Sequence, residues 1–339
     1  MIVDLRSDTV TVPTKKMLEF MMDSKVGDDV YGEDPAVNLL QTKVASMFGK
    51  DVGMFFPSGT MANQTAIKLH TNPGDQVICD KYSHIYNYEG GGASFNSGVS
   101  FNLIDGKRGM FNSDQALNSI NPKDFYHSPL SKLIAIENTT NKGGGACWDI
   151  GELKKIQKVA NSNNLGMHLD GARIWNAIVH KNDNPLEIGK IFDTISVCLS
   201  KGLGCPIGSV LIGNSKIMSN ALRIRKILGG GMRQAGYLAS AGIYALENNL
   251  SRLSEDHQRA REIGEVLAKS TYVKSVEKIE TNIVIFELNK EINDSLFIDK
   301  LKRLNIKLIS MGSNKLRLVT HLNYTNIHHD YFLSSIKSL

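Results

Sequence analysis

The chain has 339 residues, of which 42% are hydrophobic and 22% charged, and its formal net charge is +5 at pH 7. This length can bury a large core and usually divides into two domains, and the composition is ordinary for a globular protein. The sequence shows no Lys/Arg block of the kind that binds nucleic acid and no apolar run of about 18 residues. Neither nucleic acid nor a membrane is therefore expected as a partner.

The N-terminal residues show no charged segment leading into a long apolar stretch, so no signal peptide is expected. The four cysteines, at positions 79, 147, 198 and 205, form no CxxC pair. We expect them to be reduced, which favours a cytoplasmic location.

The first 70 residues predict an extended polar segment followed by two helices and a strand–turn–helix unit. Residues 4–11 are polar and extended, and by themselves suggest a surface arm. Helices are predicted over 13–22, with proline in the first turn, and from Asp34 onward at helical spacing. The strand 52–56 then leads through Pro57-Ser58-Gly59 into a helix over 60–70. Free N–H groups at that helix start can bind a phosphate, although an ordinary N-cap at Ser58 would give the same pattern.

Two histidines stand beside predicted strands. His84 follows the strand 76–79, and His127 precedes the strand 133–136. Taken alone, a histidine such as His84 after a strand is more often structural than catalytic, and His127 is explained equally by a pairing partner or a turn residue. An amphipathic helix over 151–161 then leads into the strand 166–169, which ends at Asp170.

Lys201 lies between two apolar strands, 194–199 and 209–212, in a segment with glycines at 202, 204 and 208. Small and apolar neighbours favour a buried lysine, and burial favours the neutral amine that attacks a carbonyl. The alternative is a lysine on a hairpin loop that extends into water. Asp170 precedes it by about 30 residues, so both can face one crevice at the carboxyl edge of a sheet.

Several motifs resemble one family in the same order along the chain. The segments DLRSDT (4–9), HLDGAR (168–173), SKGLG (200–204) and RLVTH (317–321) are similar to those of pyridoxal-phosphate enzymes with the aspartate-aminotransferase fold. Within that group the chain resembles the low-specificity threonine aldolases of the β-eliminating lyases. The resemblance runs nearly from end to end.

The resemblance implies an α/β protein of fold type I, with a mostly parallel seven-stranded sheet flanked by helices and a small C-terminal α+β domain. We expect the large domain, with its N-terminal arm, to span 1–248 and the small domain to span 249–339. From about residue 249 the sequence predicts a charged helix, followed by strands that alternate with a helix. The resemblance also implies a homo-oligomer, with a dimer as the active unit, paired into a tetramer. A regular face of small residues over 235–246 suits close helix packing between subunits.

The resemblance also implies which residues form the site. Lys201 would carry the cofactor pyridoxal 5'-phosphate covalently, Asp170 would pair with its ring nitrogen, and His84 would stack on the ring and serve as a candidate base. The other cofactor-binding residues implied are Gly59, Thr60, Arg173 and Arg233. The substrate-binding residues implied are Ser7, His127, Arg173 and Arg317, although position alone favours an outward-facing Arg317 on a half-exposed strand. No metal is expected.

The implied reaction is retro-aldol cleavage of L-threonine and L-allo-threonine to glycine and an aldehyde. The alternatives are β-elimination or transamination on the same fold, and a non-catalytic ligand-binding descendant, which would predict loss of Lys201 or Asp170. The sequence departs from the family at Thr140, where a histidine is usual, and at 143–149, which lacks the usual proline. We expect these departures to affect substrate preference rather than the chemistry.

Overall fold

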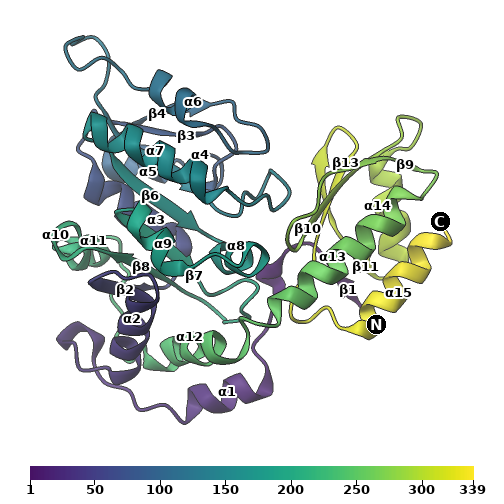
Figure 1. The fold of residues 1–339 in the computed structure, drawn as a ribbon. Helices are drawn as coiled ribbons and strands as arrows, with labels where there is room; N and C mark the ends of the chain where they lie inside the picture. The colour runs from purple at the N-terminus through teal and green to yellow at the C-terminus, as the bar shows by residue number, and fades with distance from the viewer.

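A seven-stranded sheet forms the centre of the larger of two bodies in the computed structural model, which describes residues 1–339 (Figure 1). The strand order is β2-β8-β7-β6-β5-β3-β4, and only β8 runs antiparallel to its neighbours. The strands are β2 (Val52–Phe56), β3 (Gln76–Asp80), β4 (Ser100–Ile104), β5 (Ser131–Glu137), β6 (Gly166–Gly171), β7 (Thr194–Cys198) and β8 (Ser209–Gly213). The mostly parallel seven-stranded sheet is thereby confirmed.

Helices cover both faces of this sheet, and the alternation of side chains along the strands divides the core accordingly. Ile134 and Ile136 of β5 belong to a cluster of 42 buried residues that includes α2, α7 and α12, whereas Leu133 and Ala135 pack with Ile67 of α3. The helices of this body are α1 (Lys15–Met22), α2 (Pro35–Met47), α3 (Gly59–His70), α4 (His84–Asn87), α5 (Gly92–Ser97), α6 (Ser113–Asn118), α7 (Ile150–Asn163), α8 (Ile174–Lys181), α9 (Pro185–Ile191), α10 (Ser215–Met218), α11 (Ala221–Ile227) and α12 (Gly236–Asn248). None of the helices is both long and apolar enough to cross a membrane.

The capping residues Asp34 and Ser58 determine where α2 and α3 begin. Asp34 caps α2 by accepting from the backbone N–H groups of Ala36 and Val37, with Pro35 in the first turn. Ser58 caps α3 by accepting from the N–H of Met61. The cap at Ser58 leaves the first N–H groups of α3 pointing away from the helix, where a ligand can reach them.

The smaller body is an antiparallel sheet in the order β12-β13-β10-β9, packed against helices around its own core of 17 buried residues. Its elements are α13 (Leu253–Ala268), β9 (Val273–Val276), β10 (Ile283–Leu288), α14 (Asp294–Arg303), β12 (Ile309–Gly312), β13 (Lys315–Val319) and α15 (Asn326–Lys337). The short strand β1 (Val3–Asp4) pairs with β11 (Ile306–Lys307), and Val3 and Leu5 lie in the smaller core. Both termini therefore lie on the smaller body (Figure 1). The domain division at residues 248 and 249 stays a prediction.

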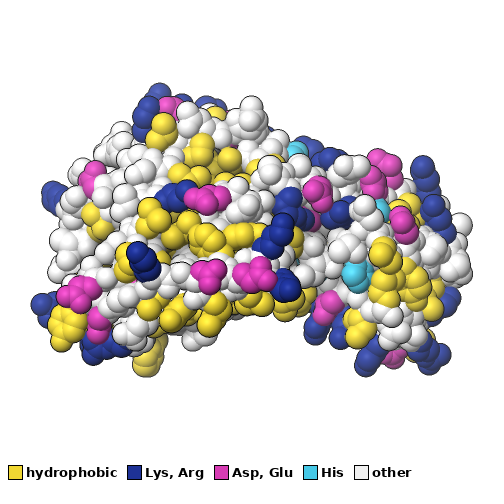
Figure 2. Space-filling view, turned by 90° about the horizontal axis from the view of Figure 1, so that it is seen from below, with side chains coloured by type: hydrophobic (Ala, Val, Ile, Leu, Met, Phe, Trp, Pro, Cys, Tyr) yellow, Lys and Arg dark blue, Asp and Glu magenta, His cyan; other side chains and the backbone are white.

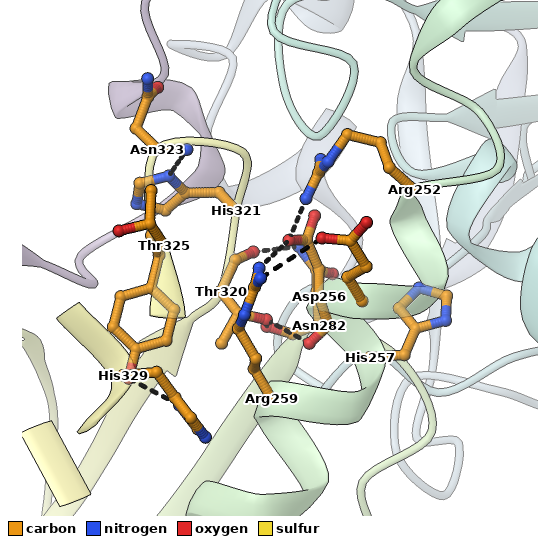
Figure 3. Close-up of polar contacts among 12 residues, drawn as sticks. Arg252, Asp256, His257, Arg259, Asn282, Thr320, His321, Asn323, Thr325 and His329 are labelled. Atoms are coloured by element: carbon orange, nitrogen blue, oxygen red, sulfur yellow. Dashed lines mark hydrogen bonds and ion pairs between the residues drawn. The ribbon is translucent and has the colours of Figure 1, made fainter. Parts of the chain in front are cut away.

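A buried polar network joins α13 to the smaller sheet (Figure 3). Asp256 is fully buried and pairs with Arg252. Thr320 Oγ1 donates to the backbone oxygen of Asp256 over 2.7 Å. Asn282 Nδ2 donates to the backbone oxygen of Thr320 over 3.0 Å and to Asp8 Oδ2 over 3.1 Å. The network thus connects the smaller body to the N-terminal segment that enters the site described next.

Candidate active site

A cavity of about 370 Å³ opens where the carboxyl ends of β6 and β7 meet the start of α3. Five residues predicted for the site line it, namely Gly59, Thr60, His84, Asp170 and Lys201. The strands are parallel and buried, so residues just beyond their carboxyl ends meet at one edge of the sheet. The structure therefore brings Asp170 and Lys201 to one crevice, as their spacing predicted, together with the three other residues that the resemblance implied.

Asp170 stands at the end of β6 with one of its two carboxylate oxygens unpartnered. Oδ1 accepts from the N–H of Ala172 over 3.1 Å, whereas the buried Oδ2 has no hydrogen-bond partner in the chain. Burial raises the pKa of this carboxyl group. A buried acceptor without a donor is costly unless a ligand supplies one. The protonated ring nitrogen of pyridoxal phosphate is such a donor, so the residues present fit that cofactor.

Lys201 lies in the turn between β7 and β8, with Nζ 3.5 Å from Cys198 Sγ. Burial by itself lowers the pKa of Lys201, but the negative charges of Cys198 and Asp8 are among those that outweigh it, so its pKa lies above the usual value. Burial thus acts toward the neutral amine, as expected, but the nearby negative charges oppose it in the ligand-free chain. The local sequence suggested an apolar pocket and gave no sign of the anionic groups within it.

His84 is the first residue of α4 and is held by Glu89. Its Nδ1 lies 2.9 Å from Glu89 Oε1, and the Glu89 side chain is completely buried. An ionised carboxylate can only accept, so His84 donates from Nδ1 and its Nε2 is left able to take a proton. Burial lowers the pKa of His84, but the hydrogen bond to Glu89 and the charge of Asp170 outweigh it and raise the pKa.

Glu89 is held by two side-chain amides, and one of these, that of Asn63, is itself oriented by further hydrogen bonds. Asn63 Nδ2 donates to Glu89 Oε1 over 2.9 Å, and Gln64 Nε2 donates to Oε2 over 2.7 Å. Asn63 Oδ1 accepts from Ser196 Oγ at 2.7 Å and lies 3.2 Å from His168 Nε2. This fixes which end of the Asn63 amide faces Glu89. Three donors therefore hold the two Glu89 oxygens in place.

Arg173 and Asp8 form a buried, two-pronged ion pair beside the cavity. Arg173 donates from Nε and Nη2 to the two oxygens of Asp8 over 2.8 Å and 2.7 Å. Burial raises the pKa of Asp8, but the Arg173 guanidinium outweighs it and lowers the pKa to about 2. Ser7, the predicted substrate ligand, caps the short helical turn that contains Asp8 by accepting from the N–H of Thr9 over 3.2 Å. The sequence reasoning missed Asp8, although it lies within the quoted DLRSDT motif.

Arg317 points inward toward Asn141 rather than outward from the edge of its strand. Its Nη1 donates to Asn141 Oδ1 over 2.8 Å, and its Nη2 donates to the backbone oxygen of Arg6 over 3.0 Å. Arg317 Nε is buried without a partner. Arg173 Nη1 also lies 3.5 Å from Asn141 Oδ1, so the two guanidinium groups converge there. Such a pair of planar cations suits a carboxylate ligand.

Glu137 at the end of β5 ties two site segments together. Oε1 accepts from the N–H of Asn141 over 2.6 Å, and Oε2 accepts from the N–H of His84 over 2.7 Å. Burial and the nearby charge of Asp170 raise the pKa of Glu137 to about 7. The sequence analysis assigned no role to Glu89, Glu137 or Asn141. The available signals were that Glu137 directly follows the predicted strand 133–136 and that Asn141 is next to Thr140.

Two predicted site residues, His127 and Arg233, neither line the cavity nor contact the Arg173, Asp8 and Arg317 groups beside it. His127 is exposed in the segment before β5, where its ring stacks on Tyr126 with 3.9 Å between centroids. That segment leads into the amino end of β5, at the opposite edge of the sheet from Asp170. Arg233 is exposed and pairs with Asp28 at 3.0 Å. Within one chain, neither residue lines the cavity at Lys201.

Thr140 also lies outside the cavity. It is 3% exposed, and its N–H donates to the backbone oxygen of Ala146 over 3.1 Å. A Cβ atom on Gly109 would lie 3.2 Å from Thr140 Cβ, and one on Gly143 would lie 2.3 Å from Thr140 Oγ1. Thr140 therefore packs against glycine backbone, and any influence on substrate preference would have to pass through the neighbouring Asn141.

The fold and the site together define a class of protein. The mostly parallel seven-stranded sheet, the lysine after β7 and the acid with a free oxygen at the end of β6 are those of a fold type I pyridoxal-phosphate enzyme. The chain belongs to the beta-eliminating lyase family, whose model matches residues 4–291. Family membership confirms the expectation of a pyridoxal-phosphate-dependent lyase.

Individual relatives are similar over nearly the whole chain. A low specificity L-threonine aldolase of Escherichia coli K12 is 42% identical over 95% of this chain and 94% of its own length. A probable low-specificity L-threonine aldolase 2 of Arabidopsis thaliana is 37% identical over 99% and 97%. Among solved structures, a Leishmania major threonine aldolase has a TM-score of 0.84 at 20% identity, covering 99% of both chains. A putative L-allo-threonine aldolase of Listeria monocytogenes has a TM-score of 0.81 at 19% identity, covering 99% and 96%.

Proposed function

We propose that this protein cleaves L-threonine, L-allo-threonine and related β-hydroxy-α-amino acids into glycine and an aldehyde. The names of its most similar relatives support this reaction. The observation that carries the proposal is the arrangement in one cavity of Lys201 Nζ, the unpartnered Asp170 Oδ2 and a histidine whose Nε2 is left free.

The cofactor-binding roles follow from the atoms that face the cavity. Pyridoxal phosphate, when bound, supplies an electron sink for the bond that breaks. Lys201 holds the cofactor covalently, and Asp170 Oδ2 accepts from the protonated ring nitrogen. The first N–H groups of α3, at Gly59 and Thr60, point to where its phosphate would bind.

The substrate-binding roles follow from the two converging arginines. Arg317, with Arg173 and Ser7, would hold the α-carboxylate and so orient the Cα–Cβ bond for cleavage. His84 Nε2 then takes the β-hydroxyl proton as that bond breaks. Glu89 stabilises the resulting imidazolium through its hydrogen bond to Nδ1, so the proton can stay on His84 until the aldehyde leaves.

The products formed distinguish this reaction from its alternatives. From each threonine diastereomer we expect one glycine for every acetaldehyde formed. β-Elimination would instead give a keto acid and ammonia from a β-substituted amino acid. Borohydride reduction followed by peptide mapping should place the cofactor on Lys201, and Lys201→Ala should lose this label while Lys300→Ala, on exposed α14, keeps it. A label on another lysine would refute the assignment of Lys201, and keto acid without glycine would refute the reaction.

We further propose a dimer as the smallest active unit, paired into a tetramer. His127 and Arg233 lie outside their own chain's cavity, which supports their acting in a partner's site. Apolar side chains gather on the underside of the larger body (Figure 2), the side on which α1 and α12 lie in Figure 1. The exposed large hydrophobic residues of α1, α2 and α12 are Leu18, Phe20, Met22, Leu39 and Tyr237.

Mixed oligomers test this assembly. Lys201→Ala and Arg233→Ala chains, each inactive alone, should regain activity when mixed if Arg233 acts across the interface. Hybrids with confirmed subunit exchange and no recovery would show that each site is built from one chain.

All four cysteines are buried and free, which supports a reducing, cytoplasmic compartment.

A further inference from the structure

A second cluster of titratable side chains lies away from the cavity at Lys201. Cys147 stands between β5 and α7, His180 is in the last turn of α8, and Glu280 precedes β10 in the smaller body. One ligand atom from each residue lies within 4.8 Å of the other two. Three segments far apart in sequence, from both bodies, therefore converge on one point.

Each residue of the cluster has a side-chain atom that could bind a metal ion and that makes at most one weak contact within the chain. The ring nitrogens of His180 form no hydrogen bond in the structure, and Cys147 Sγ makes a single long contact, 3.8 Å to the backbone oxygen of Gly145. Glu280 Oε1 accepts from Arg108 Nη1 over 2.6 Å, whereas Oε2 receives only the N–H of Cys147 at 3.4 Å. Three ligand atoms with at most one weak contact each therefore lie close enough together to share a metal ion.

We propose that Cys147 Sγ, His180 and Glu280 Oε2 bind a zinc ion, with water as the fourth ligand. Thiolate, imidazole and carboxylate are the ligands that zinc prefers, at about 2.3 Å for sulfur and about 2.0–2.2 Å for nitrogen and oxygen. A tetrahedron with those bonds separates its ligand atoms by about 3.5 Å. Closing the cluster from 4.8 Å thus requires shifts of about 1 Å, within reach of side-chain rotation. The thiolate and carboxylate together neutralise the ion.

The surroundings both oppose and assist binding. Lys181 and Lys278 line the adjoining cavity of about 750 Å³ and repel a cation, although Lys278 is exposed to water, which weakens its effect. Arg108 is already committed, because its guanidinium donates to Glu280 Oε1 and to the backbone oxygens of Gly143 and Lys278. It therefore orients the carboxylate so that Oε2 faces the cluster, as second partners of metal ligands do.

Zinc binds the thiolate form of cysteine, so binding at Cys147 would displace the thiol proton to the solvent, and the affinity should rise with pH. A bound ion would also tie the segment after β5 and α8 to the smaller body. It would thereby stabilise the two bodies in the arrangement that places Arg317 beside Asn141.

The proposal is tested by zinc titration of the full, cofactor-loaded enzyme after removal of metals with a chelator. We expect one zinc ion per chain with an apparent Kd on the order of 1 μM or tighter, weaker than four-ligand structural sites. Zinc-edge X-ray absorption should show one sulfur neighbour at about 2.3 Å. Zinc should also raise the thermal midpoint of the wild-type enzyme.

Matched variants separate this site from other zinc binding. Cys147→Ser, His180→Ala and Glu280→Gln should each weaken zinc binding by about 10-fold or more and abolish the thermal shift. Cys79→Ser, which alters another buried thiol in β3, should change neither. Cofactor absorbance and aldolase activity without zinc should stay unchanged in these variants, which shows that they are folded. Sub-stoichiometric binding, an absorption spectrum without sulfur, or full affinity in Cys147→Ser would overturn the proposal. The last result would show that zinc binds the chain without Cys147.

Discussion

Replacing Asp8 by Asn tests how the N-terminal segment supports the site. Asp8 is fully buried, and its two oxygens accept from Arg173, which is 5% exposed. The substitution keeps the size of the side chain and can keep the contact with Asn282. It removes the negative charge and leaves the Arg173 guanidinium buried without the carboxylate that pairs with it.

The expected loss follows from the pKa of Asp8, which is about 2 in the folded chain against an ordinary value of 3.8. That difference corresponds to about 2 kcal/mol of stability at neutral pH. Breaking a buried pair by removing one partner typically costs about 3–5 kcal/mol. We therefore expect Asp8→Asn to lower the free energy of unfolding by about 3 kcal/mol at pH 7. Because the folded pKa is depressed, the wild-type advantage should persist above about pH 4 and disappear as the pH falls toward about 2.

Urea denaturation at one fixed chain concentration, followed by circular dichroism, measures this loss. Asp4→Asn is the matched control, because Asp4 also pairs with an arginine, Arg6 at 2.6 Å, but both side chains are partly exposed, at 23% and 47%. Exposed pairs contribute about 0–1 kcal/mol, so this control should change little. Equal losses in the two variants would refute the reasoning that burial makes the Asp8 pair important.

Three further predictions concern the residues around the cavity. Glu89→Gln should lower kcat for threonine by about 100-fold with little change in KM. The reason is that the glutamine would no longer fix the tautomer of His84 or stabilise the His84 cation. An unchanged kcat would refute this role of Glu89. The raised pKa of Glu137 means that its stabilisation is complete below about pH 4.5 and is lost as the pH rises through about 7. Between pH 5 and 8, the free energy of unfolding measured by urea denaturation should therefore depend less on pH in Glu137→Gln than in wild type. Parallel pH profiles would count against this contribution of Glu137. Thr140→His should lower the thermal midpoint, because the larger ring must fit against the Gly109 and Gly143 backbone. An unchanged midpoint with an altered diastereomer ratio would instead support direct contact with substrate.

The sequence by itself determined the position of the central site. Asp170 and Lys201 each follow an apolar run that forms a parallel-sheet strand, and such strands end at the same edge. The helix start at Gly59 was readable for a similar reason, since Ser58 is a local capping signal. These features depend on residues that are close in sequence, where periodicity and capping chemistry act directly. The end-to-end order of the motifs added the cofactor and the reaction class.

The tertiary structure alone decided which charges meet. Asp8 and Arg173 are 165 residues apart, and Arg317 and Asn141 are 176 apart. No local propensity encodes such a pairing, because it depends on how the smaller body packs against the larger. The same limit explains the pKa of Lys201, which burial alone would lower and which nearby anions raise. It also explains why Thr140, beside the site in sequence, packs away from it in space. Electrostatic energies depend on distances and burial in three dimensions, and these become defined only once the chain has folded.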